Sequence, residues 1–112
     1  MNKQTAPRVW TEDEVRDKFL QHVAVMTRYW ERESRVTTAR EKLEGLAFSI
    51  LAALDGSSAA IPGFVVAPAP HKDDRAFHIG EGENYYPKAP KVECDIAGGL
   101  HELIHKVLRD TP

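Results

Sequence analysis

The sequence predicts a single α+β domain: an N-terminal antiparallel helix hairpin packed with a small antiparallel sheet of two or three strands and a C-terminal helix. Three observations support this fold class. Two capped amphipathic segments fill the first half of the chain, short apolar runs divided by Pro and Gly follow, and a third amphipathic segment comes last. A length of 112 residues suits one domain. We therefore expect residues 1–112 to form one domain, with residues 1–9 as a mobile leader.

The first helix is predicted to begin at a capping box formed by Thr11 and Glu14. In such a box the Thr side chain accepts a hydrogen bond from the backbone N–H of the Glu, and the Glu side chain accepts one in return. Apolar residues then recur every three or four positions, which indicates one buried stripe opposite a polar, mostly basic face. The stripe is Val15, Phe19, Val23, Met26 and Trp30, and the polar face includes Arg16, Lys18, Gln21, Arg28 and Arg32. The helix is expected to end near Ser34.

A second helix is predicted between a capping box at Thr38 and Glu41 and a stop at Gly56. Its apolar residues form a wide stripe, so we expect it to be the most buried element. Gly45 weakens a helix interior by up to about 1 kcal/mol relative to Ala, and it is therefore expected to mark the close approach of another backbone. The short break before Thr38 predicts that the two helices pack as an antiparallel hairpin.

Three short strands are predicted in the second half of the chain, over residues 64–67, 76–79 and 91–94. In the second of them, Phe77 and Ile79 would share one face of the sheet, because side chains alternate along a strand. Prolines after residue 67 confine the first strand to an edge or end it, since proline cannot donate to a strand ladder.

The last helix is predicted over residues 96–108, with Asp95 as its cap. Its apolar arc consists of Leu100, Leu103, Ile104, Val107 and Leu108. Gly98 and Gly99 fall in the first turn, where two glycines weaken a helix. We expect them to allow close packing of another backbone, with an anion on the exposed N–H groups as the alternative.

Composition and charge exclude several classes of function. The 15 basic and 17 acidic residues give a formal net charge of −2, which offers no basic field for nucleic acid. The longest apolar run is about half of the roughly 20 residues that a membrane-spanning helix needs. The chain has one cysteine, Cys94, and cannot form an internal disulfide, which is typical of a reducing compartment. A cytoplasmic protein that binds neither nucleic acid nor membrane is therefore expected.

Polar and aromatic side chains gather in one irregular stretch, residues 71–86. Adjacent tyrosines in a Gly-containing loop supply aromatic surface with polar tips, as binding sites do. The candidate binding residues are His71, Asp73, Asp74, His78, Tyr85 and Tyr86. The alternative is a solvated hairpin tip in which the tyrosine rings cover the edge of the core.

The sequence His-Glu-Leu-Ile-His, which begins at His101, matches the pattern H-E-x-x-H. Residues i and i+4 lie on one side of a helix, so two imidazoles can bind one zinc ion and the glutamate can act as a general base. The match resembles the active-site helix of zinc metallopeptidases, which implies His101 and His105 as metal ligands and Glu102 as the catalytic base. In that family the third ligand comes from downstream. Here it would come from upstream, from His71, His78 or an acidic residue near them.

Two functional hypotheses follow. The first, which the sequence favours, is a small intracellular binding or interaction protein without catalytic activity and without a cofactor, in which the two histidines at 101 and 105 belong to the polar face of an ordinary helix. The alternative is a minimal zinc-dependent hydrolase. Aromatic residues in excess of one narrow stripe predict a homo-oligomer, most simply a dimer, or a protein partner.

Overall fold

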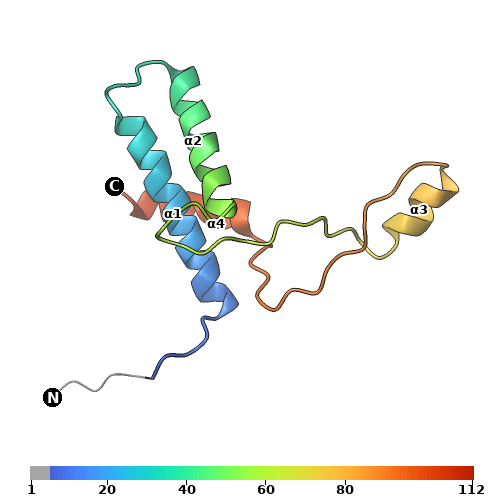
Figure 1. Ribbon diagram of the computed structural model, residues 1–112. Coiled ribbons are helices and arrows are strands. Elements are labelled where there is room, and N and C mark those ends of the chain that lie inside the picture. Colours follow the sequence, from blue (N-terminus) through green and yellow to red (C-terminus); the bar gives the residue numbers. More distant parts are fainter. Residues whose placement is uncertain (1–5) are drawn as a thin grey trace.

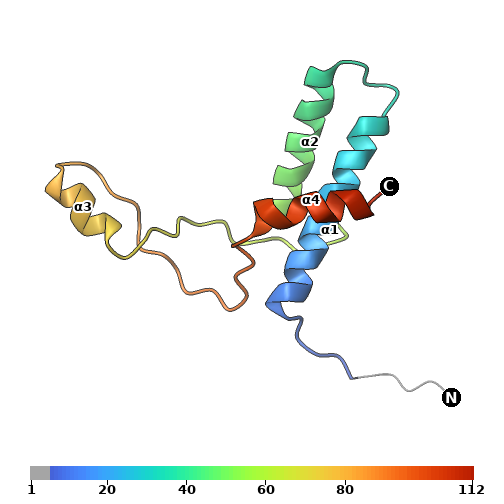
Figure 2. The ribbon, with the colours of Figure 1, turned by 180° about the vertical axis from the view of Figure 1, so that it is seen from behind.

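The computed structural model describes residues 6–112, and within that range the fold is all-α (Figure 1). Helices α1 (Glu12–Arg32) and α2 (Ala39–Leu54) form an antiparallel hairpin, and α4 (Leu100–Asp110) crosses α1 on one side (Figure 2). The short helix α3 (Asp74–Gly80) lies apart from the other three. The predicted hairpin and C-terminal helix are confirmed.

The predicted α+β class is wrong, because residues 6–112 contain no strand. Residues 64–67 and 91–94 lack regular structure, and residues 76–79 belong to α3. A strand needs a neighbour that accepts and donates backbone hydrogen bonds. The prolines at positions 68 and 70 follow the first segment and those at 87 and 90 precede the last one, so neither segment can be extended on that side by residues that all donate an N–H. Alternation over the four residues 76–79 is also too short to separate a strand from one turn of helix.

The capping box at the start of α1 is confirmed. The Glu14 N–H donates to Thr11 Oγ1 at 3.2 Å, and the Thr11 N–H donates to Glu14 Oε1 at 3.0 Å. Arg8 adds two hydrogen bonds to the same carboxylate, at 2.7 and 2.8 Å, and together these contacts lower the pKa of Glu14 to about 2. The leader predicted over residues 1–9 falls partly on residues 1–5, which lie outside the described range. Residues 6–9 form no helix, yet Arg8 ties them to α1.

Thr38 caps helix α2, but the reciprocal bond of the predicted capping box is absent, because the Glu41 carboxylate accepts from the Thr38 hydroxyl at 2.8 Å instead of from its backbone N–H. The Glu41 N–H donates to Thr38 Oγ1 at 3.2 Å. The expectation that α2 is the most buried element is also wrong. Of its 16 residues only Ala53 is buried. Phe48 is 73% exposed, and Leu43 and Leu51 are nearly as open. The apolar residues cover so wide an arc of α2 that the helix could contact two neighbours. Helix α1 is one of these neighbours.

A close approach does occur at Gly45, but the group that approaches is the side chain of Trp30 and not the backbone that we expected. A Cβ built on Gly45 would be 2.7 Å from three atoms of the Trp30 indole. That ring is fixed in turn, because its Nε1–H donates to Ser49 Oγ at 2.9 Å. The two helices therefore pack closely where the Trp30 indole lies against Gly45.

Gly45→Ala is expected to destabilise the protein by about 1–2 kcal/mol, although Ala normally stabilises a helix interior by up to about 1 kcal/mol relative to Gly. The added methyl group would displace the Trp30 ring and break its bond to Ser49. Urea unfolding followed by circular dichroism measures the change. In a Trp30→Phe background, where the smaller ring leaves room, the same substitution should cost clearly less. An equal cost in both backgrounds would contradict this explanation.

The C-terminal helix begins at Leu100, four residues later than predicted. Gly98 and Gly99 have φ of 103° and 73°, a left-handed conformation that is incompatible with the first turn of a helix. A Cβ at Gly98 would meet nothing within 4 Å. The two glycines therefore serve the turn of the chain rather than the close packing that we expected. Asp95 accepts from the Ala97 N–H at 2.9 Å instead of capping the helix.

The hydrophobic core is small and lies where α1, the end of α2 and the following segment meet. Phe19, Ala53 and Ile61 form its centre. Partly buried residues surround it: Val23, Leu54, Phe64, Ile96 and Leu100. Elsewhere only Leu20 and Ala24 are buried among the apolar residues described.

Residues 65–95, which we call the arm, project from this core and carry α3 at their far end (Figure 1). Both roots of the arm are fixed to the helices. The Phe64 N–H donates to the Leu54 carbonyl at 3.0 Å, and the Phe64 ring meets Phe19 edge-on with 5.3 Å between centroids. At the other root, Arg16 Nε–H donates to the Ile96 carbonyl at 2.9 Å. The arm is therefore a long loop that is anchored at both ends, and not a free tail.

The chain is much less compact than a typical domain of its length. Its radius of gyration is 18.4 Å, whereas about 13 Å is usual for a domain of this length. Its longest extent is 57 Å. No helix between residues 6 and 112 is long and apolar enough to cross a lipid bilayer.

Candidate functional site

The six candidate binding residues lie together at the far end of the arm, within residues 71–86, which we call the tip. Three of them form hydrogen bonds with one another at the start of α3. The His71 N–H donates to Asp74 Oδ2 at 2.8 Å, and the Asp73 N–H donates to His71 Nδ1 at 3.2 Å. These bonds fix the turn that leads into the helix, although no side chain caps the helix itself.

The other side chains of the tip hold the returning chain against α3. His78 Nδ1 lies 3.4 Å from Glu83 Oε1, and the Arg75 guanidinium lies 5.3 Å from the centre of the Tyr85 ring. The Glu83 N–H also donates to the His78 carbonyl at 2.9 Å. The tip is therefore a small structured unit although it has no contact with the core.

Both tyrosine rings of the tip are open to solvent. Tyr86 is 66% exposed and Tyr85 is 46% exposed. Since the tip lies away from the helices (Figures 1 and 2), the rings do not cover the edge of the core. The part of the alternative in which the rings cover the core is therefore wrong, whereas the tip is solvated, as that alternative expected.

Sequence analysis missed the apolar part of the tip, because it assigned Phe77 and Ile79 to a buried strand face. In the structure both belong to α3, and they are 61% and 52% exposed. His78 and Asp74 are more covered than either of them. Helix α3 thus turns its polar residues toward its own arm and its apolar residues toward solvent.

A second apolar surface lies on the side of α2 that faces away from α1. With a step of about 100° per residue, Leu43, Ala47, Phe48 and Leu51 fall within an arc of roughly 140°, and all four are exposed. We call these four residues the outer face of α2. The excess of aromatic and aliphatic residues over one stripe was the sequence signal for this surface.

The outer side of α4, in contrast, is polar and contains the H-E-x-x-H match. His101 is 87% exposed, and its Nε2 lies 3.6 Å from Glu102 Oε1. His105 is also exposed. Residues 6–112 contain no group of three His, Cys, Asp or Glu side chains that could hold a metal ion. The structure thus does not place His71 or His78 beside the two histidines, and we base no proposal on the zinc alternative.

Comparison with protein-family models, with curated proteins and with solved structures finds no match. The function must therefore be argued from the surfaces themselves.

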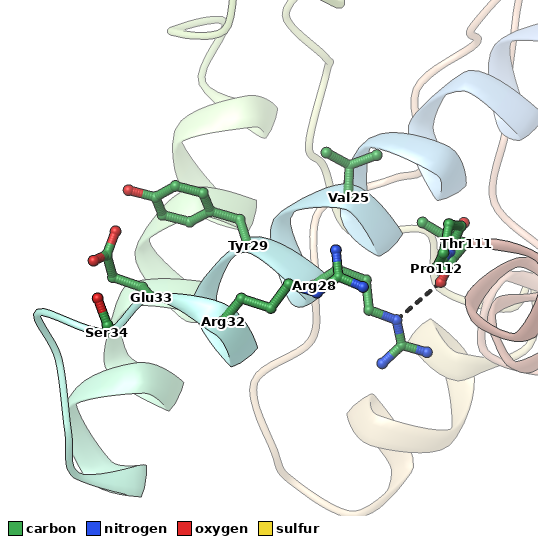
Figure 3. A pocket seen from close by; sticks show the side chains of 8 residues that line it. All are labelled: Val25, Arg28, Tyr29, Arg32, Glu33, Ser34, Thr111 and Pro112. Atoms are coloured by element: carbon green, nitrogen blue, oxygen red, sulfur yellow. Dashed lines mark hydrogen bonds between the residues drawn. The ribbon is translucent and has the colours of Figure 1, made fainter.

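An open pocket of about 460 Å³ lies where the end of α1 meets the C-terminus (Figure 3). Its lining is mixed: Val25, Arg28, Tyr29, Arg32, Glu33, Ser34, Thr111 and Pro112. Arg35 donates hydrogen bonds to Glu33 and lowers the pKa of that carboxyl to about 2. This ion pair stabilises the end of α1 at pH values above about 4.5, and its contribution is lost as the pH falls toward 2.

Arg28 closes one side of this pocket and fixes the end of α4. Its Nη2 donates to the Leu108 carbonyl at 2.9 Å. Its Nε donates to the Thr111 carbonyl at 3.0 Å, the bond that Figure 3 shows. A helix C-terminus has carbonyls without partners and carries partial negative charge, so a guanidinium is suited to it. Sequence analysis placed Arg16 and Arg28 on the polar face of the first helix without a partner, and both donate hydrogen bonds to the C-terminal segment.

Arg28→Met is expected to destabilise the protein by about 1.5–3 kcal/mol, because two charge-assisted hydrogen bonds to carbonyls are lost while the aliphatic stem is kept. Arg32→Met is the matched control. Arg32 lines the same pocket, and its side chain makes no hydrogen bond to the described residues 6–112, so its replacement should change stability by less than about 0.5 kcal/mol. Urea unfolding of both variants decides the matter. Equal effects of the two would show that Arg28 is an ordinary surface arginine.

Proposed function

We propose that this protein is a small intracellular interaction protein that assembles with further copies of itself through the arm. The observation that carries the proposal is the amount of apolar surface that one copy cannot cover. Fifteen large hydrophobic residues are exposed within residues 6–112, and seven of them belong to the arm. Those seven are Val65, Val66, Phe77, Ile79, Tyr85, Tyr86 and Val92.

The total surface supports the same proposal. The chain exposes 9236 Å², whereas a compact monomer of 12.6 kDa exposes about 6,200 Å². The excess is roughly 3,000 Å². A lasting homodimer buries about 1,000–2,500 Å² on each subunit, so the excess is large enough to form such an interface. Cys94 is exposed and has no second cysteine to pair with, which fits an intracellular, reducing location.

Equilibrium sedimentation at tens of micromolar tests the proposal. The expected result is a dimer or a larger closed assembly. The double variant Phe77→Ser, Ile79→Ser should shift the equilibrium toward monomer by at least tenfold, because both side chains are removed from the proposed contact. Lys72→Ser, an exposed change in the same arm, should leave the equilibrium unchanged. A monomeric parent protein would refute the proposal.

A further inference from the structure

Helix α3 has an apolar face with a hollow centre. At about 100° per residue, Ile79, Ala76, Gly80 and Phe77 follow one another around an arc of roughly 160°. The two small residues lie in the middle of the arc and the two large ones at its edges. A Cβ built on Gly80 would meet nothing within 4 Å, so the centre of this face is open.

The outer face of α2 has the opposite shape. Leu43, Ala47 and Leu51 follow each other at intervals of four residues, which places them in one ridge along the helix. Helices pack when a ridge on one enters a groove on the other. The hollow between Phe77 and Ile79 is therefore suited to a ridge of this kind.

The arm also has the reach that this contact needs. A 16-residue helix such as α2 is about 24 Å long. The extended stretch of about ten residues between the root at Phe64 and the start of α3 can span up to roughly 33 Å. The tip lies far from α2 of its own chain in both views (Figures 1 and 2). Both roots of the arm are fixed to α1 and α2.

We infer that the apolar face of α3 in one copy docks on the outer face of α2 in a second copy. This inference rests on the proposed function and names the two surfaces of the assembly. A contact between two α2 helices would leave the arm exposed, whereas arm exchange covers both apolar surfaces at once. One chain carries both surfaces, so a second copy supplies both partners and the contact can close with two-fold symmetry. The polar outer side of α4 takes no part.

A disulfide between the two surfaces tests the inference. Ala47 lies on the ridge and Ala76 in the hollow, and both are exposed, so cysteine is tolerated at either position. In a Cys94→Ser background, the double variant Ala47→Cys, Ala76→Cys should form a covalent dimer under mild oxidation. A disulfide requires Cα atoms about 4.4–6.8 Å apart, so only a specific contact forms one efficiently. Each single-cysteine variant should cross-link at least tenfold less. Replacing Ala47→Cys with His105→Cys on the outer side of α4 should abolish the product.

Other outcomes separate the two proposals. Efficient cross-linking of Ala47→Cys alone would show that α2 packs on α2, which overturns the inference while the protein still self-assembles. An oxidised monomer without free thiols would show that the arm folds back on its own chain, which overturns it as well. A sedimenting dimer without any cross-link in the double variant rejects the arm-to-α2 contact. A monomer by sedimentation rejects both this contact and the proposed function.

Discussion

Phe19→Ala is expected to remove about 3–5 kcal/mol of folding free energy, the usual cost of truncating a buried aromatic residue. Phe19 is 9% exposed and lies at the centre of the core with Ala53 and Ile61. Its ring also meets Phe64, which fixes one root of the arm. The substitution therefore loosens the hairpin, the segment after α2 and the arm together. Far-UV circular dichroism during urea unfolding measures the loss.

The size of this effect depends on how few residues form the core. Small domains have a total stability of about 5–15 kcal/mol, and five buried apolar residues among residues 6–112 place this chain at the low end. Val9→Ala is the control, because Val9 is exposed and its truncation should cost less than about 0.5 kcal/mol. A cost below 1 kcal/mol for Phe19→Ala would mean that the core is not where the structure places it.

The thermal unfolding midpoint should rise by about 3–5 °C for each tenfold increase in protein concentration. Unfolding of a dimer gives two chains, so each tenfold increase in protein concentration raises the free energy of unfolding by about 1.4 kcal/mol. Divided by the entropy of unfolding of two such chains, this energy corresponds to a shift of the stated size. A folded monomer would show no shift. Differential scanning calorimetry over two decades of concentration measures the midpoint.

Leu51→Glu should both lower the midpoint and remove its dependence on concentration. The substitution places a charge on the outer face of α2, and an interface that buried it would leave it without a partner. His105→Glu adds the same charge to the polar outer side of α4, and it should keep the concentration dependence of the parent protein. If Leu51→Glu behaves like His105→Glu, α2 faces solvent in the assembled protein.

Local signals in the sequence predicted the helices well. The caps at Thr11 and Thr38 depend on a side chain and an N–H group three residues apart, so each can be recognised without knowledge of the fold. Gly45 was equally informative, because a glycine inside a strong helix has a cost that some contact must offset. The indole that makes this contact lies on the neighbouring helix, and the sequence did not identify it.

The region between the second and last helices was predicted wrongly because its apolar residues have no partner within the chain. Phe77 and Ile79 are apolar in a short alternating pattern, and a buried strand was the simplest explanation for them. Their environment in one copy is solvent, so no rule based on burial within the chain applies to them. The six binding candidates lie together in the structure because they are close in sequence, and their role in binding stays a prediction, whereas the outer face of α2 was assigned to the core.

The two fixed roots of the arm make the chain tolerant of being cut. A protease that cleaves once between residues 65 and 95 would leave α1 and α2 on one fragment and α4 on the other. The second fragment would stay attached through the bonds that Arg16 and Arg28 donate to its backbone and through the packing of Ile96 and Leu100 on the core. The arm can thus be cleaved once, or can accept an inserted sequence, while α1, α2 and α4 stay packed together.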